Sequence, residues 1–291
     1  MKSGAEARRE KEKELEKAGK PVSFPGWDKL RVEETEDKPE IVLTVADETG
    51  QVVRRFTGPG GKGVHRVAWD LRYPAVEPTE IESKERDEWD WNPQGPLVVP
   101  GTFTVSLAKK LDGVLTPLGK PETFTVESLA LAGLAEKDRA ALLAFQKKAG
   151  ELQRAMMGAG AAAEEASKNL KFMKKALMET PKADPKLAER IKALDKRLQE
   201  AMRTLYGDRT MQRRSEPSAP SLMDRVNAQL STTSPITQTA RRGYEIAADA
   251  FGKFLEDLRT LIEVDLKKLG DEMEAAGAPW TPGRGVPVWK E

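Results

Sequence analysis

The chain has 291 residues, of which 48 are Lys or Arg and 47 are Asp or Glu, so its formal net charge is +1. A balanced charge argues against a general nucleic-acid binder and against a polybasic membrane anchor. The chain has no cysteine and a single histidine, His65, which leaves no material for disulfides, thiol catalysis or multi-histidine zinc sites. No run of about 18 apolar residues predicts a membrane span, and the charged segment 1–20 lacks the apolar core of a secretory signal.

The amino-acid composition changes abruptly near residue 130. Most of the prolines, four of the six tryptophans and the β-branched runs precede this point, and Ala, Leu, Lys and Glu dominate after it. This change, in a chain long enough for two cores, predicts an α+β multidomain protein. We expect an N-terminal immunoglobulin-like β-sandwich followed by a long antiparallel three-helix bundle. The expected parts are a charged helical arm over 1–20, the sandwich over 21–128, the bundle over 129–277 and an extended Trp/Pro tail over 278–291.

Alternation of apolar and polar side chains in the first domain predicts six or seven short strands. They include 40–47, 51–56, 64–71, 102–109, 114–118 and 122–127. The residues expected to face the core are Ile41, Leu43, Val45, His65, Val67, Trp69, Leu71, Phe103, Val105, Leu107, Phe124 and Val126. His65 is therefore expected to be a hydrogen-bonded histidine in the core or at its edge, and Trp69 to fill the place that the disulfide takes in antibody domains. The turn 24–27 (FPGW) is expected to cap a core.

Steps of three and four residues between apolar side chains predict long helices in the second domain. They span 135–178, 185–206 and 235–277, with a short helix over 221–230 and a polar loop over 208–220. Asp184 is the expected N-cap of the second long helix, and Ser234 that of the last. Gly158 and Gly160 are expected to lower the helicity of the first long helix and to bend it. The segment 3–19 is predicted as a helix that is either solvated or packed on something outside this chain.

The long loop 74–96 carries the candidates for a ligand site. It is rich in proline and acidic residues, and Asp87 and Asp90 stand beside Trp89 and Trp91. A glycosidase uses two carboxylates, and aromatic platforms often hold sugars. This loop, however, has no rigid scaffold on both sides to hold two carboxylates around a scissile bond. The favoured interpretation is therefore that Trp89 or Trp91 plugs the edge of the sandwich or docks onto the helices, with sugar binding and catalysis as the alternatives.

The glycine-rich stretch 58–63 (GPGGKG) resembles a phosphate-binding loop in composition alone. It precedes a predicted strand and not a helix, so it does not fit such a loop.

A pair of arginines stands near the start of the last predicted helix. Arg241 and Arg242 lie in its first turn, where the helix dipole disfavours cations. Their position predicts a structural salt link to an acidic partner such as Glu245 or Asp249 on the same helix.

Five segments carry a resemblance to a known family. They are 52–55 (VVRR), 63–73 (GVHRVAWDLRY), 95–105 (GPLVVPGTFTV), 231–237 (STTSPIT) and 274–282 (EAAGAPWTP). Together they resemble the C-terminal region of large bacterial BNR-repeat, sortilin-like proteins, which often carry the label glycosyl hydrolase. The pairing of the second segment with the third is the more specific part, and the resemblance extends over nearly the whole chain.

The resemblance implies a detached C-terminal portion of an exported protein whose tandem β-propellers come first. Any active site of such a protein would lie in the propellers, so the resemblance brings no catalytic, cofactor-binding or metal-binding residue to this chain. The residues that match the family motif, and that we interpret as structural, are His65, Arg66, Trp69, Asp70, Pro100 and Gly101. The implied location is the periplasm or the extracellular space. Without such a parent protein the chain, which has no signal of its own, would be cytoplasmic.

The first functional expectation is a non-catalytic accessory module that needs no cofactor and whose helices hold a protein partner or brace the propellers. The alternatives are an enzyme of the glycoside hydrolase type, which would depend on Asp87 and Asp90, and a carbohydrate-binding module that uses Trp89 and Trp91. An activity assay on variants of the acids separates the enzyme from the accessory module. Tryptophan quenching on a panel of glycans tests the carbohydrate-binding module.

Overall fold

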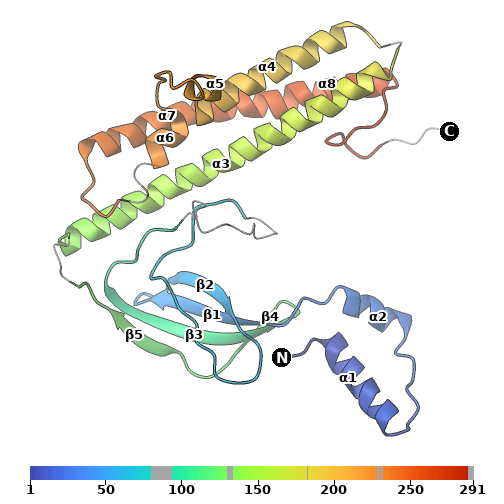
Figure 1. Ribbon diagram of the computed structural model, residues 1–291, viewed down its shortest axis with the longest axis vertical. Coiled ribbons are helices and arrows are strands. Elements are labelled where there is room, and N and C mark those ends of the chain that lie inside the picture. The colour runs from blue at the N-terminus through green and yellow to red at the C-terminus, as the bar shows by residue number, and fades with distance from the viewer. Residues whose placement is uncertain (80–93, 130–133, 182, 228–229, 231, 288–291) are drawn as a thin grey trace. The chain divides into compact units, whose positions relative to one another are not determined.

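A computed structural model describes residues 1–79, 94–129, 134–181, 183–227, 230 and 232–287 (Figure 1). The chain divides into two compact units. One consists of Met1–Pro74 and Leu97–Gly133, and the other of Ala75–Pro96 and Leu134–Glu291. The first unit holds an antiparallel sheet and the second holds long helices, so the predicted α+β class is confirmed.

The first unit is built on a five-stranded antiparallel sheet. Its strands are β1 (Glu40–Asp47), β2 (Val52–Gly58), β3 (Gly101–Leu111), β4 (Val114–Pro117) and β5 (Glu122–Val126). β1 lies between β2 and β3, and the other edge of β3 pairs with β5 along its first half and with β4 along its second half. Asp47 closes the β1–β2 turn, because its Oδ1 accepts hydrogen bonds from the backbone N–H groups of Thr49 and Gln51.

One face of this sheet is apolar and buried. The strand register places Val45 opposite Val105 and Phe103 opposite Phe124, so these side chains share a face. Val45, Val53 and Phe103 are the buried centre of the core on this face. The opposite face carries mostly threonine, serine and alanine. The residues predicted to face inward in β1, β3 and β5 therefore share one face, but Leu107 is 39% exposed, and Val42 on the other face is buried instead.

The predicted strand 64–71 is absent, and this prediction was wrong. These residues make no strand pairing, and the contact between Arg72 and Leu97 that follows them is an isolated bridge. The segment crosses the apolar face of the sheet as irregular chain, where Trp69 packs against Phe103. Within the described residues of this unit the strands form one sheet of five, which is fewer than the six or seven strands expected.

The N-terminal segment forms two helices, α1 (Gly4–Lys17) and α2 (Trp27–Glu34). α1 is the predicted charged helix, and it begins at a capping box formed by Ser3 and Glu6. Arg8 joins the two helices, because two nitrogens of its guanidinium bind the carboxylate of Glu33. The sequence did not predict α2, and Trp27 lies exposed at its start, so the expectation that this turn caps a core was wrong.

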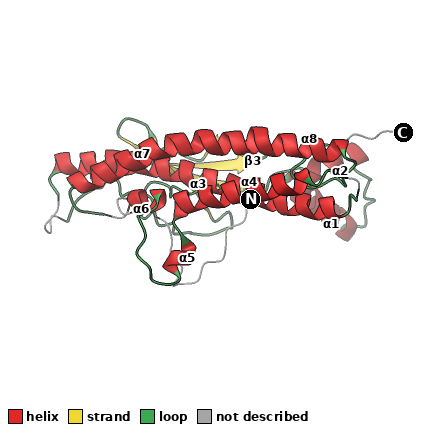
Figure 2. Cartoon of the chain, turned by 90° about the horizontal axis from the view of Figure 1, so that it is seen from above, coloured by secondary structure: helices red, strands yellow, loops and turns green. Residues whose placement is uncertain are grey.

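The second unit contains three long helical segments. They are α3 (Glu136–Met178), α4 (Lys186–Tyr206) and a continuous run of α7 (Gln238–Arg259), η1 (Thr260–Leu266) and α8 (Lys267–Ala275). The short helices α5 (Arg209–Gln212) and α6 (Leu222–Asn227) lie between α4 and α7 along the chain. Buried apolar residues from the three long segments and from α6 form one core, and the segments run alongside one another in Figures 1 and 2. In the part of the chain that the structure describes, no helix combines the length and the apolarity that crossing a membrane requires.

Both predicted helix starts differ from the structure by one or more residues. The N-cap of α4 is Pro185 and not Asp184, although Asp184, one residue earlier, accepts a hydrogen bond from the backbone N–H of Lys186. The last long segment begins at residue 238 and not near Ser234, because Thr237 is its N-cap and accepts a hydrogen bond from the backbone N–H of Ala240.

The last long segment widens into a π-helical turn at η1. Before this turn its buried residues recur every three or four positions, as an α-helix requires. Leu261 and Leu266 are both buried and are five positions apart. The wider π-helical turn accommodates this extra residue, so both leucines face the same core.

The C-terminal tail turns back on itself within its described residues and is not extended as predicted. The indole Nε1–H of Trp280 donates a hydrogen bond to the carbonyl oxygen of Gly285. The guanidinium of Arg284 forms an ion pair with Glu274 on α8 and donates to the carbonyl oxygen of Pro279. These contacts hold the tail against the end of the last helix.

Candidate functional site

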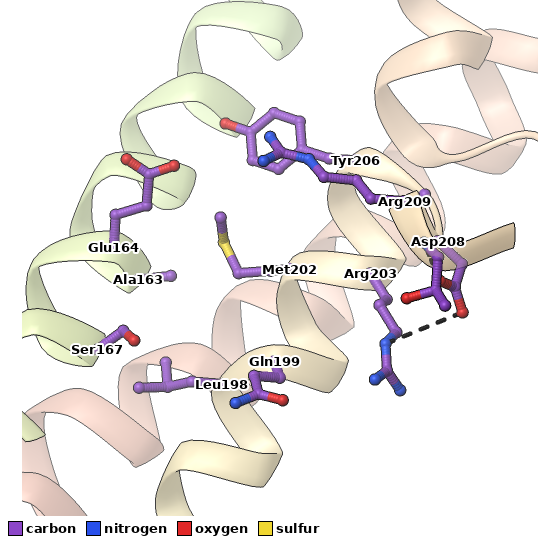
Figure 3. Close-up of a pocket in the computed structure, with 12 residues that line it drawn as sticks. Ala163, Glu164, Ser167, Leu198, Gln199, Met202, Arg203, Tyr206, Asp208 and Arg209 are labelled. Carbon is purple, nitrogen blue, oxygen red and sulfur yellow. Dashed lines mark hydrogen bonds and ion pairs between the residues drawn. The ribbon is translucent and has the colours of Figure 1, made fainter. Parts of the chain in front are cut away.

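A hollow of about 260 Å³ lies between α3 and the end of α4 (Figure 3). α3 contributes Glu164 and Ser167 to its lining, and α4 contributes Met202 and Tyr206. In Figure 3 the hydroxyl of Tyr206 is directed toward α3. The turn 207–210 after α4 completes the lining. The lining of the hollow therefore comes from the two long helices α3 and α4 and from the start of the short helix α5.

Gly160 allows α4 to approach α3 at this hollow. A Cβ added at Gly160 would overlap the hydroxyl of Tyr206 and would lie 2.8 Å from its Cζ, which is closer than side chains pack. A Cβ added at Gly158 would meet nothing within 4 Å. The two glycines do not interrupt α3, which runs continuously over 43 residues, so the expected loss of helicity was wrong. The role of Gly160 is instead to leave room for the ring of Tyr206.

Tyr206 keeps its proton in this environment. Burial raises the pKa of its hydroxyl above the ordinary value, and the negative charge of Glu164 raises it further. A neutral phenol both donates and accepts hydrogen bonds. Tyr206 therefore offers the hollow a neutral hydrogen-bonding group at physiological pH.

Asp208 is held in its ionised form beside Tyr206. Its carboxylate caps α5 by accepting hydrogen bonds from the backbone N–H groups of Thr210 and Met211. The bond from Thr210 is the largest cause that lowers the pKa of Asp208 below its usual range. The guanidinium of Arg203, whose Nε lies 4.0 Å from Asp208 Oδ2, contributes to the same shift (Figure 3).

The hollow combines charged groups of both signs with apolar side chains. Glu164 and Arg209 border it, and Leu198 and Met202 supply apolar surface. Such a lining suits recognition of a polar group on a ligand or on a protein. The sequence did not single out these residues as a site. The available signals were a glycine inside a helix and an N-capping aspartate directly after one.

The residues of the family motif lie in the first unit. His65 is exposed, and its Nε2 lies 3.0 Å from the carbonyl oxygen of Gly61, so the expected inward position was wrong. Arg66 is also exposed. Asp70 accepts a hydrogen bond from the backbone N–H of Arg72. His65 misses the core because the segment that carries it is not part of the sheet.

Trp69 is the motif residue that joins the core. Its ring stands edge-on to Phe103 and Phe124, with centroid distances of 5.5 and 6.1 Å. Its Nε1–H donates a hydrogen bond to the carbonyl oxygen of Arg72. The polar end of the indole is therefore satisfied while the rest of the ring packs on the sheet.

The other predicted residues lie at the start of β3 and in the long loop. Pro100 precedes β3 and Gly101 is its first residue, so the two lead directly into the strand that carries the buried Phe103. The predicted ligand-binding residues Asp87, Trp89, Asp90 and Trp91 lie outside the described residues. In the described ranges, no group of three or more His, Asp or Glu side chains is arranged to hold a metal ion.

The paired arginines at the start of α7 are used within the helical unit. Nη1 of Arg242 lies 3.2 Å from Oε2 of Glu245, which is one of the two predicted partners. The guanidinium of Arg241 lies over the ring of Phe145, 5.9 Å from its centroid. The predicted structural role is therefore confirmed for Arg242.

Two aromatic rings near the N-terminus remain in solvent. Phe24 is 62% exposed and Trp27 is 69% exposed, and their ring centroids are 5.1 Å apart in an edge-to-face arrangement. Val32, also on α2, is 61% exposed. Large apolar side chains that stay exposed together are typical of a protein-binding surface.

Comparison of the chain with protein-family models, with curated proteins and with solved structures finds no match. The functional argument therefore depends on the residues and the geometry described above.

Proposed function

We propose that this chain is a non-catalytic accessory module that binds another protein, and that it is the C-terminal part of an exported BNR-repeat protein. Its partner is the propeller region of that parent protein or a protein bound beside it. In this proposal the first unit is an immunoglobulin-like β domain and the second is an antiparallel three-helix bundle. The location that follows is the periplasm or the extracellular space.

The exposed aromatic pair of Phe24 and Trp27 is the observation that carries the proposal. Folding of the chain leaves both rings largely in water. Aromatic side chains are enriched in the centres of protein interfaces, and tryptophan is among the residues that contribute most to binding. Full burial of a large apolar side chain is worth about 1.5–3 kcal/mol. A partner that covers both rings would gain this free energy at a surface that the chain already presents.

The segment 63–73, which carries the family motif, supports the same proposal. Trp69 seals the apolar face of the sheet, whereas Val64 is fully exposed and Val67 is 38% exposed. A segment that closes a core and also presents apolar side chains is suited to contact a neighbouring domain.

Recovery of the native assembly tests this proposal. An antibody against the chain is used for immunoprecipitation from the source cells, and mass spectrometry identifies the recovered peptides. We expect peptides of BNR repeats, either in the same polypeptide or in a stable complex. The isolated propeller region should also bind the chain, and Trp27→Ala should weaken that binding about tenfold or more. The matched control is Leu115→Ala, which removes an exposed apolar side chain from β4.

Two results would overturn the proposal. One is recovery of the chain without BNR-repeat peptides, and the other is propeller binding that Trp27→Ala leaves unchanged. Retention on glycans that depends on Trp89 and Trp91 would favour a carbohydrate-binding module. Hydrolysis that is lost on substitution of Asp87 and Asp90 would favour an enzyme.

A further inference from the structure

A larger hollow lies where α3 ends and α4 begins. Its volume is about 880 Å³, and its lining is predominantly apolar. Leu177 and Ala183 are partly exposed in it, and Met178, the last residue of α3, is 81% exposed. Methionine is common on surfaces that accept varied apolar side chains, and a groove between two helices accepts the apolar face of a third.

Lysines without ion-pair partners border this groove. Lys171 and Lys174 lie one turn apart on α3, and Lys192 lies on α4. Among the described residues, the side-chain ammonium group of none of the three makes an ion pair or a hydrogen bond. The last three turns of α3, 168–178, carry four lysines and no acidic residue. The helix dipole favours cations only in the last turn, so it does not account for Lys171, about two turns from the end.

The two acidic residues in the lining are engaged by the chain itself. Asp184 accepts a hydrogen bond from the backbone N–H of Lys186 at the start of α4. Asp195 accepts one from the side-chain amide of Gln199. These donors are neutral, so both carboxylates keep their charge, but three lysines against two aspartates still leave the lining with a positive excess.

We propose that this groove binds an acidic amphipathic helix of a protein partner. The apolar face of that helix fills the groove beside Met178, and its carboxylates pair with Lys171, Lys174 and Lys192. The assignment rests on the proposed interaction function and adds the chemistry of the partner. The concave shape between two helices fits a helix better than an anionic membrane, whose surface is flat.

Fluorescence anisotropy with labelled peptides tests the assignment on the full chain. The probe is a helix-forming peptide of about 18 residues, or about 27 Å, with leucines along one stripe and glutamates at the other positions. A second peptide has lysines in place of the glutamates, and a third has the composition of the first in scrambled order. We expect saturable binding of the glutamate peptide alone, and we expect added salt to weaken it.

Variants of the groove sharpen this test. Reversing its three charges with Lys171→Glu, Lys174→Glu and Lys192→Glu should weaken binding about 10- to 100-fold, because each attraction becomes a repulsion. Met178→Gln should weaken binding about fivefold by removing apolar contact. The matched control reverses three exposed lysines outside the groove, and its effect should stay within about twofold. Those lysines are Lys137, Lys253 and Lys268. Circular dichroism shows that each variant is folded.

Equal binding of all three peptides would overturn the assignment, as would unchanged binding by the charge-reversed variant. Binding of phosphatidylserine vesicles without binding of the glutamate peptide would overturn it in favour of a membrane. The propeller experiment depends on Trp27 in the other unit. If the chain binds the propeller region through Trp27 but does not bind the glutamate peptide, only the groove assignment is refuted. If it binds the peptide but not the propeller region, only the propeller proposal is refuted.

Discussion

Two alanine substitutions on α3, two residues apart, test the packing that forms the hollow in Figure 3. Gly160→Ala places a methyl group 2.8 Å from Cζ and 2.9 Å from Cε2 of Tyr206, so the ring has to move. Overpacking of this kind costs about 1–3 kcal/mol. Replacing a helical glycine by alanine returns about 0.5–1 kcal/mol. We therefore expect Gly160→Ala to lower the free energy of unfolding by up to about 2 kcal/mol.

Gly158→Ala is the matched control. Its methyl group meets nothing within 4 Å, so only the gain in helix propensity remains. This variant should raise the free energy of unfolding by about 0.5–1 kcal/mol. Urea unfolding followed by far-UV circular dichroism measures both variants, because that signal comes mainly from the helices. The two substitutions should shift the unfolding midpoint in opposite directions.

A variant of the tyrosine isolates the cause. In a chain that already carries Tyr206→Ala, Gly160→Ala should stabilise by about 0.5–1 kcal/mol, because the ring that it overlaps is gone. If Gly160→Ala stabilises the unmodified chain as much as Gly158→Ala does, the ring of Tyr206 does not occupy this space. The reasoning about the hollow would then be refuted.

Three further predictions concern the core, the π-helical turn and acid stability. Trp69→Ala should cost about 3 kcal/mol and Trp69→Phe about 1 kcal/mol in urea unfolding, and equal costs would contradict the packing described. Deleting the exposed Val264 from η1 should convert the π-helical turn to α-helix and keep the same residues in the core. Deleting Lys253 from α7 should instead rotate all later residues by about 100° around the helix axis, out of the core, and so lower the melting temperature sharply in calorimetry. Because the pKa of Asp208 is lowered in the folded chain, its stabilisation is present above the pKa of an unfolded aspartate and is lost as the pH falls through the folded value. Asp208→Asn should therefore flatten the acid side of the stability–pH curve, and an unchanged curve would contradict this.

The sequence predicted the helices better than the sheet for a physical reason. Each long helix buries one face, so its apolar residues recur with the helical period and reveal it. Alternation over 64–71 shows which side chains are apolar, but it does not show whether the segment pairs with a neighbouring strand. An irregular segment that lies on the sheet can also place Trp69 against its core, where the ring is partly buried. Leu71 has a φ of 58°, a left-handed conformation that is uncommon outside glycine and that no local pattern predicts here.

The candidate site depends on contacts that local patterns do not reveal. Gly160 and Tyr206 lie on different helices, so a glycine expected to bend α3 instead makes room for a neighbour. The turn 24–27 was expected to cap a core, because large aromatic side chains are usually buried, but both rings lie largely in solvent. The π-helical turn was equally hidden, since Leu258, Ile262 and Leu266 keep the regular four-residue step of an α-helix in the sequence. Only the structure shows that Leu261 is buried, five positions before Leu266.

A second glycine of α3 makes room for the long loop. A Cβ at Gly150 would overlap the side chain of Val76, and Nη2 of Arg154 lies 3.4 Å from the carbonyl oxygen of Ala75. The chain therefore leaves the β unit after Pro74, contacts α3, and returns at residue 97. The start of the loop that carries the acidic residues and tryptophans is anchored on the helical unit.

Helix α3 thus supports three separate surfaces along its length. Gly150 contacts the start of the long loop 74–96, Gly160 contacts Tyr206, and Lys171 borders the groove between α3 and α4. Because the three positions lie about 15 Å apart along the helix, a substitution at one leaves the contacts of the others in place. A partner whose binding is lost with Gly150→Ala, but kept when Lys171 is reversed in charge, would contact the loop and not the groove. The helix therefore lets binding be assigned to one surface at a time.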